Sequence, residues 1–368
     1  MSSHSYDTTP VWSWAAPVAA GALLAVIFAG VVPPDAVPVS LAECVLLCGA
    51  VFAAVHHAEV LAVRLGEPFG SILLAIAVTV IEVALIVSIM LSGKAGSDAV
   101  ARDTIFSAVI IALNGIIGLC LVFGAQRHHE QSFQLQGASA TLAVLGTLAT
   151  FALILPNYTV ATLGPLYSPV QLLFIGAVSV ALYGIFVFVQ TIRHRNYFLE
   201  VGDDALESGD APHDKPSNKT TSISVVLLIF SLVAVVLLAK VLSGPLDKIV
   251  AMAGLPQAFV GVVIAAIVLL PEGLAAVKAA LVNRLQSSIN LALGSALASI
   301  ALTIPTVAVV SLLLGQKLVL GLTPADTVLL LLTLFVSTLT LGTGRTTVLQ
   351  GAVHLVIFIV FILMAAVP

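Results

Sequence analysis

Long runs of apolar residues alternate with short polar segments along the whole chain. An apolar helix of about 20 residues is long enough to cross the hydrocarbon core of a bilayer. By that measure the pattern predicts eleven membrane-spanning helices. They lie near residues 11–32, 38–61, 70–92, 104–124, 138–157, 169–192, 222–243, 257–281, 287–314, 325–342 and 346–367.

The composition supports this prediction, because 60% of the 368 residues are hydrophobic and only 9% are charged. Such values exclude an ordinary soluble globular domain. We therefore expect an all-α polytopic membrane protein whose surroundings are the lipid bilayer, and nothing in the composition indicates nucleic-acid binding.

The positive charges predict an orientation. Residues 1–10 carry no Lys or Arg, so we do not expect a cleavable signal peptide. Most of the 14 Lys and Arg residues fall on the same side of the predicted spans as the N-terminus. The positive-inside rule therefore predicts a cytoplasmic N-terminus. With an odd number of spans, the C-terminus would lie on the periplasmic or extracellular side.

Two carboxylates stand alone inside apolar runs: Glu82 in the predicted helix 70–92, and Glu272, behind Pro271, in the predicted helix 257–281. An ionisable group within a span costs about 2.5 to 3.5 kcal/mol on insertion scales, so it normally serves a pathway or a partner. A structural hydrogen bond to a neighbouring helix is the alternative. Because proline removes a backbone donor, we expect the helix to kink or unwind at Pro271 and to free a carbonyl.

Oxygen-bearing side chains accompany both acids, and the candidates for supporting ligands are Thr79, Asn114, Ser295 and Ser299. Such groups can supply oxygens to a cation or hydrogen bonds to another helix, and for Asn114 both interpretations stay open. Single polar residues in the last two predicted helices, Asp326 and His354, are expected to satisfy local structure. We interpret His56 and His57 as a helix-end polar cluster rather than a metal site, because adjacent helical side chains point about 100° apart.

Glu82 and Glu272 lie five predicted spans apart, and an odd offset reverses the direction in which a helix crosses the membrane. This layout is typical of inverted-repeat transporters, whose sites lie near the bilayer midplane. It predicts an N-terminal segment with one extra helix at residues 1–37, two inverted five-helix repeats at 38–192 and 222–368, and an acidic cytoplasmic linker at 193–221.

The residues leading to Glu82 resemble the first signature repeat of the calcium/cation exchanger superfamily, and in particular its bacterial ChaA-type calcium/proton antiporters. That segment begins Leu61-Ala-Val-Arg-Leu-Gly-Glu-Pro-Phe-Gly. The second repeat is similar around Glu272, which is followed by Ala276-Val277, Ala280, Asn283-Arg284, Leu291-Ala-Leu-Gly-Ser and Pro305. The resemblance covers about residues 50–310.

The chain also departs from this family. The cation/proton branch usually has Gly-Asn-Ala-x-Glu before each acid, whereas this chain has Val78-Thr79-Val80-Ile81 and Val268-Leu269-Leu270-Pro271. The glutamine common in the later motif falls on Ala298. These departures leave the ion preference open among Ca²⁺, Na⁺ and K⁺.

The resemblance implies a secondary active transporter, not an enzyme, that exports Ca²⁺ in exchange for protons by alternating access. Glu82 and Glu272 would form the primary Ca²⁺/H⁺ site, since their two negative charges match either one Ca²⁺ or two protons, and no further cofactor is expected. Calcium takes six to eight oxygens. The supporting ligands named above, backbone carbonyls and water would complete that number.

The family implies a bacterial cytoplasmic (inner) membrane as the location. A sodium/calcium exchanger without proton coupling and a cation channel are the alternative functions. Whether the chain forms a homo-oligomer is left open by the sequence.

Overall fold

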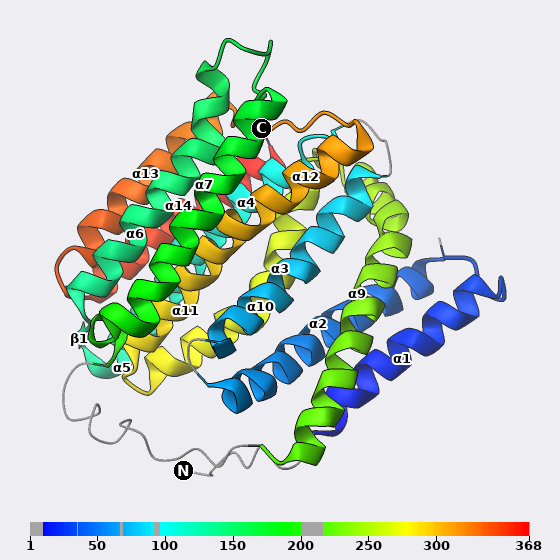
Figure 1. Cartoon of the computed structure of the whole chain (residues 1–368), viewed down its shortest axis with the longest axis horizontal. Coiled ribbons are helices and arrows are strands. Elements are labelled where there is room, and N and C mark those ends of the chain that lie inside the picture. Colours follow the sequence, from blue (N-terminus) through cyan, green and yellow to red (C-terminus); the bar gives the residue numbers. More distant parts are fainter. Residues whose placement is uncertain (1–9, 35, 67–68, 92–95, 201–215, 368) are drawn as a thin grey trace. The chain divides into compact units, whose positions relative to one another are not determined.

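The computed structural model describes residues 10–34, 36–66, 69–91, 96–200 and 216–367 (Figure 1). Within this part, eleven helical segments are long and apolar enough to cross a membrane. The prediction of an all-α polytopic membrane protein with eleven spans is therefore confirmed. The strands in the described residues are two residues long: β1 (Gln131–Ser132) pairs antiparallel with β2 (Arg345–Thr346).

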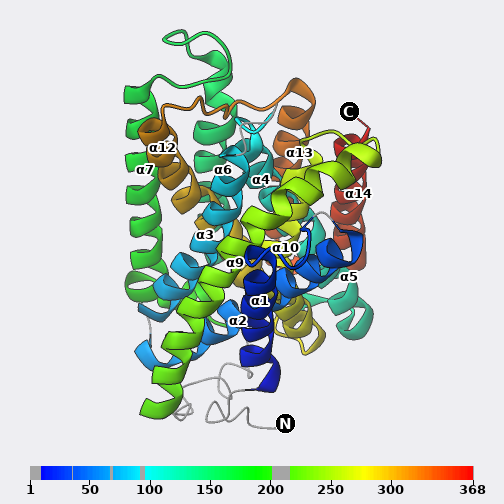
Figure 2. The ribbon, with the colours of Figure 1, turned by 90° about the vertical axis from the view of Figure 1, so that its right-hand side faces the viewer.

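The described helices divide between two compact units. The first unit contains α1 (Val11–Phe28), α2 (Val37–Leu65), α3 (Phe69–Met90) and α9 (Asn218–Met252). α2 packs against the other three helices, and Figures 1 and 2 both show α9 running beside it. α9 continues beyond the predicted span 222–243 and contains Pro245. Each unit takes helices from both predicted repeats, so the compact units and the repeats divide the chain differently.

The second unit contains nine described α-helices, several of them extended or joined by π-helical segments. They are α4 (Val100–Ile110), α5 (Ile117–His128), α6 (Leu135–Ala149), α7 (Pro169–Phe188), α10 (Phe259–Leu281), α11 (Leu285–Ala298), α12 (Ile304–Leu314), α13 (Pro324–Leu341) and α14 (Val348–Ala366). The π-helices are Ile111–Ile116 between α4 and α5, Thr150–Ile154 after α6, Val189–Arg193 after α7, and Ser299–Thr303 between α11 and α12. Short 3₁₀ turns occupy Leu155–Tyr158 and Arg195–Phe198. α10 packs against α4, α5 and α11.

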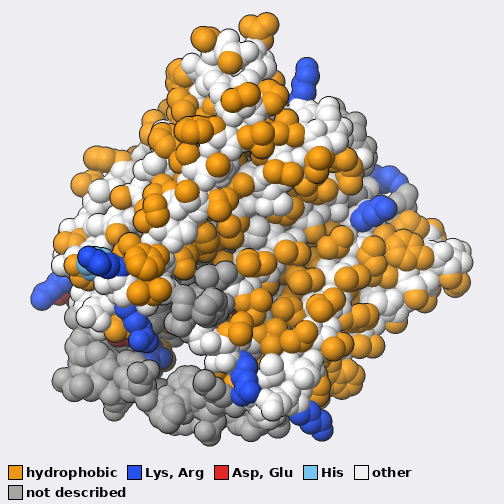
Figure 3. Space-filling view, viewed as in Figure 1, with side chains coloured by type: hydrophobic (Ala, Val, Ile, Leu, Met, Phe, Trp, Pro, Cys, Tyr) orange, Lys and Arg blue, Asp and Glu red, His pale blue; other side chains and the backbone are white. Residues whose placement is uncertain are grey.

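The surface is suited to lipid. Figure 3 shows hydrophobic side chains over most of the face in view, with Lys and Arg side chains mainly toward its edges. Large apolar side chains such as Phe174 on α7, Ile229 on α9 and Ile359 on α14 are more than half exposed. Apolar surface on this scale is unfavourable in water but matches hydrocarbon, and the helices satisfy their backbone groups internally.

The start of the predicted linker is attached to the second unit. Asn290 Nδ2 donates a hydrogen bond to the Phe198 carbonyl at 2.7 Å. The backbone N–H and the hydroxyl of Ser287 donate to Glu200 Oε1 at 3.0 and 2.5 Å. Because Ser287 lies in the first turn of α11, the Glu200 carboxylate satisfies one of the open N–H groups at that helix end.

The end of the linker is attached to the first unit. Arg64 at the end of α2 donates to the Pro216 carbonyl at 3.1 Å and to Asn218 Oδ1 at 2.6 Å. Most of the acidic residues predicted for the linker fall in 201–215 and lie outside the described residues. Hydrogen bonds therefore hold the residues just before and just after 201–215.

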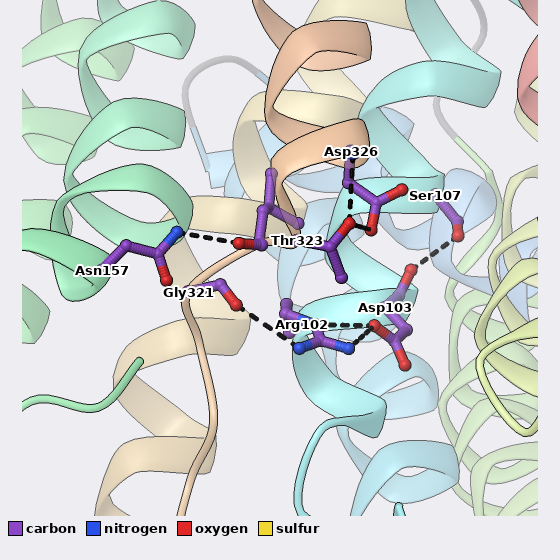
Figure 4. Close-up of polar contacts among 8 residues, drawn as sticks. Arg102, Asp103, Ser107, Asn157, Gly321, Thr323 and Asp326 are labelled. Atoms are coloured by element: carbon purple, nitrogen blue, oxygen red, sulfur yellow. Dashed lines mark hydrogen bonds and ion pairs between the residues drawn. The ribbon is translucent and has the colours of Figure 1, made fainter. Parts of the chain in front are cut away.

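The connection between α12 and α13 is fixed to the start of α4. Arg102 pairs with Asp103 at 2.7 Å and also reaches the Gly321 carbonyl at 3.4 Å (Figure 4). Asn157 Nδ2 donates to the Leu322 carbonyl at 2.8 Å. These contacts satisfy backbone carbonyls of an extended segment that has no helical hydrogen bonds of its own.

α13 begins with a side-chain cap. Thr323 Oγ1 accepts from the Asp326 backbone N–H at 3.2 Å and donates to Asp326 Oδ2 at 2.7 Å (Figure 4). An acid in the first turn also interacts favourably with the helix dipole. Asp326 therefore has the local structural role expected from the sequence.

Gly261 allows α10 to lie directly against α4, because a Cβ atom there would come within 2.8 Å of backbone atoms of Asp103 and Thr104. We predict that Gly261→Ala lowers the free energy of unfolding by about 1 to 3 kcal/mol, the usual cost of overpacking. The measurement is the midpoint of thermal unfolding in detergent. Gly184→Ala in α7 is the matched control, because a Cβ there has no neighbour within 4 Å. Equal midpoints for the two variants would contradict this interpretation of the α4–α10 contact.

Candidate cation-binding site

Glu82 lies in α3 and is only 2% exposed. Thr79 precedes it by three residues on the same helix face and is also buried. The Thr79 hydroxyl donates to the Ala75 carbonyl at 2.8 Å. Because that bond uses the proton of the hydroxyl, its oxygen can serve other groups as an acceptor.

The first unit contains another buried acid, which the sequence interpretation missed. Glu43 in α2 is fully buried. The signal that found Glu82, an ionisable residue inside an apolar run, also applies to Glu43, which lies near the start of the predicted span 38–61. The structure thus adds Glu43 to the buried carboxylates of this chain.

His57 joins three helices of the first unit. Its Nε2 lies 3.1 Å from the Ser13 carbonyl of α1 and its Nδ1 lies 3.2 Å from Ser224 Oγ of α9. Since a carbonyl can only accept, Nε2 carries the proton and Nδ1 accepts from the Ser224 hydroxyl. Both ring nitrogens therefore have protein partners. His57 lies eight residues before the end of α2 at Leu65, so it is a buried residue of the helix interior and not part of a helix-end cluster.

Glu272 lies in α10 of the second unit and is 8% exposed. The helix is continuous from Phe259 to Leu281, so of the two outcomes expected at Pro271, a kink or an unwound turn, the unwound turn does not occur. The ring of Pro271 still removes one backbone donor, and the carbonyl of Ile267, four residues earlier, loses its usual helical partner. A helix can tolerate this when neighbouring groups or water satisfy the carbonyl.

The other candidate ligands of the second unit lie at or near π-helices. Asn114 is fully buried within the π-helix Ile111–Ile116, and Ser299 begins the π-helix Ser299–Thr303. Ser295 lies one turn earlier on α11 and is partly exposed. Single π-helical turns inside α-helices are frequent at functional sites.

The structure brings the segments of the second unit together. α10 packs against α11, and the π-helix Ile111–Ile116 packs against both helices. A Cβ on Gly273, the residue after Glu272, would lie 3.2 Å from Ile116 Cδ1. The turn that carries Glu272 therefore touches the segment that carries Asn114, whereas Thr79 and Glu82 belong to the first unit.

Comparison with known proteins relates this chain to cation transporters. The sequence model of the family described as sodium/calcium exchanger protein matches two regions, residues 36–192 and 223–367. A Sinorhizobium fredii protein, y4hA, described as a candidate ionic transporter, is 58% identical and covers 98% of this chain and 97% of its own length. The sodium-potassium/proton antiporter ChaA of Escherichia coli is 34% identical, over 90% of this chain and 89% of its own.

Among solved structures, the H⁺/Ca²⁺ exchanger CAX has the same fold, with a TM-score of 0.69 at 17% sequence identity over 97% of this chain and 90% of that one. These relatives with a stated activity are antiporters, which are transporters and not enzymes. The resemblance to ChaA-type antiporters seen in the sequence is thereby confirmed. Because the family's sequence model matches both halves of the chain, this integral membrane protein belongs to the sodium/calcium exchanger protein family.

Proposed function

We propose that this chain exchanges a metal cation for protons by alternating access, and that Glu82 and Glu272 hold either the cation or the protons. The observation that carries the proposal is that Glu82 in the first half of the chain and Glu272 in the second half are buried in apolar helices, 2% and 8% exposed. A buried carboxylate must be neutralised, and a cation or a proton can do so. The antiport activity of ChaA supports the exchange of one for the other.

The positions of the two acids support a repeat. Glu82 and Glu272 lie at nearly the same distance from the starts of the two regions that match the family. The π-helices Ile111–Ile116 and Ser299–Thr303 also lie at nearly the same distance from those starts. Since five spans separate the acids, the repeats would be inverted, which is the arrangement that allows alternating access.

Charge and ligand number explain how the exchange is coupled. Two ionised glutamates carry two negative charges, which either one Ca²⁺ or two protons neutralise. Calcium also needs six to eight oxygens at about 2.3 to 2.6 Å. Thr79, Asn114, Ser295, Ser299, the Ile267 carbonyl and water are the oxygens that we propose for this role.

We propose Ca²⁺ as the principal cation, because its charge balances both carboxylates. A Na⁺ or K⁺ ion, the cations named for ChaA, would balance only one carboxylate and leave the other for a proton. CAX, which shares the fold, exchanges Ca²⁺. In this proposal the three ions compete for one set of oxygens. Ca²⁺ displaces two protons, and Na⁺ or K⁺ displaces one.

We predict that Glu82→Gln and Glu272→Gln each reduce exchange by about a hundredfold or more, because a neutral amide can neither balance a cation nor release a proton. The measurement uses purified protein in liposomes with an imposed pH gradient, to which Ca²⁺, Na⁺ or K⁺ is added separately while internal pH and ion uptake are followed. Glu130→Gln is the control, because that side chain is 52% exposed.

The outcomes of this assay separate the alternatives. Full activity in either variant would contradict the proposed roles of the glutamates. Calcium uptake driven by a sodium gradient, with no ion dissipating the pH gradient, would instead show a sodium/calcium exchanger. Electrical conductance without proton movement would show a channel.

Competition between cation and protons predicts a pH dependence. Lowering the pH on the side from which the cation binds protonates the carboxylates, so the KM for the cation should rise by about tenfold per pH unit for each proton displaced. The maximal rate at saturating cation should change much less. A KM that stays constant over the pH range of measurable uptake would contradict a shared site.

We propose that the protein lies in a bacterial cytoplasmic membrane, with the N-terminus inside and the C-terminus outside. The excess of Lys and Arg on the N-terminal side and the odd number of spans support this orientation. Alkaline phosphatase fused to the C-terminus should be active, and a green fluorescent protein fusion should not fluoresce. The opposite pair of results would reverse the orientation.

A further inference from the structure

A cluster of four polar side chains is buried in the second unit. Asn114 lies in the π-helix Ile111–Ile116, Thr333 and Thr340 lie in α13, and His354 lies in α14. Asn114, Thr333 and His354 are fully buried, and Thr340 is 4% exposed. We call these four residues the His354 cluster.

Hydrogen bonds connect the cluster in a single chain. Asn114 Nδ2 donates to Thr333 Oγ1 at 2.8 Å. Asn114 Oδ1 lies 2.9 Å from His354 Nδ1, and His354 Nε2 lies 3.2 Å from Thr340 Oγ1. With the amide oxygen facing the ring, Nδ1 carries the proton and Nε2 accepts from the Thr340 hydroxyl. Both polar atoms of the Asn114 amide are therefore held, one of them by His354.

Glycines bring α14 close enough for these bonds. A Cβ on Gly118 of α5 would lie 3.2 Å from His354 Cβ, and a Cβ on Gly351 of α14 would lie 2.8 Å from Leu121 Cβ. Small residues permit this close approach of helices, and buried polar side chains then bond across the contact. The contact places His354 against the π-helix.

The opposite side of the π-helix touches α10. Gly273, directly after Glu272, faces Ile116 of the same π-helix. The segment Ile111–Ile116 thus contacts α13 and α14 through the bonds of Asn114, and it contacts the turn of α10 that carries Glu272 through Ile116. A change in how His354 holds Asn114 can therefore reach the candidate site through one packed segment.

We propose that His354 is a positioning residue of the cation site. By its bond to Asn114, His354 holds the π-helix Ile111–Ile116 in place against the turn of α10 that carries Glu272. This inference rests on the proposed function, because it takes Glu272 and Asn114 to be cation ligands. From the sequence, His354 was expected only to satisfy local structure, so this inference adds a role in cation binding. His354 itself need not touch the cation.

Two substitutions separate the two bonds of His354. In His354→Asn the side-chain amide can stand where Nδ1 stands and keep the bond to Asn114. In His354→Gln the longer side chain places its amide near the position of Nε2, so it keeps the bond to Thr340 and loses the bond to Asn114. The two variants have similar polarity, and they differ in the contact that the inference concerns.

The readout is the dissociation constant for Ca²⁺, and separately for Na⁺, from the cation-dependent rise in the thermal unfolding midpoint of purified protein. We expect His354→Asn to stay within about twofold of the unmodified protein and His354→Gln to bind about five- to tenfold more weakly, the range of one lost hydrogen bond. In an Asn114→Ala background the two variants should bind equally. Midpoints without cation report any general loss of stability.

Equal cation affinities for the two variants in the otherwise unmodified protein would overturn the inference, as would the absence of any cation-dependent stabilisation of the unmodified protein. The proposed function fails on a different result, since it requires the pH gradient in liposomes to be dissipated. Because this binding measurement needs no proton movement, the inference on His354 can be judged even if proton coupling is wrong.

Discussion

An ionised carboxylate in an apolar helix is unfavourable by several kcal/mol unless a positive charge or a proton neutralises it. Glu82 and Glu272 are both buried in helices that are apolar along most of their length. Under the proposed function, the same cost that makes such residues rare in spans would also couple the exchange. A carrier whose empty, charged form is unfavourable moves when it is loaded with the cation or with protons.

Irregular backbone inside a membrane survives only where protein or water satisfies its polar groups. In this chain two of the described π-helices are largely buried: every residue of Ile111–Ile116 and four of the five residues of Ser299–Thr303. Asn114 lies in Ile111–Ile116, and the neighbouring α10 carries Pro271 beside Glu272. A π-helical turn and a carbonyl that has lost its helical donor thus both lie near the acid of the second unit, where a cation could use backbone oxygens.

The sequence was sufficient to predict the spans, because lipid acts on every residue of a helix and the pattern is visible along one dimension. It also revealed Glu82 and Glu272, since a lone charge in an apolar run is equally visible, and the same criterion should have revealed Glu43. The bond between His354 and Asn114 joins residues 240 positions apart. Such a pair depends on helix packing, and the local sequence of the π-helices gives no signal for them.

The two halves of the chain share backbone features more closely than side chains. α14 packs against the π-helix Ile111–Ile116, and α7 packs against the π-helix Ser299–Thr303. On α14 the contact includes His354, which bonds to Asn114 in the π-helix. On α7 the buried Ser179 instead donates to Ile175 of its own helix. A repeated scaffold therefore supports two different polar environments, so its two acids would meet a cation with different neighbouring oxygens. Substitutions of the polar residues in one half can then change the ion preference while the fold of both halves is retained.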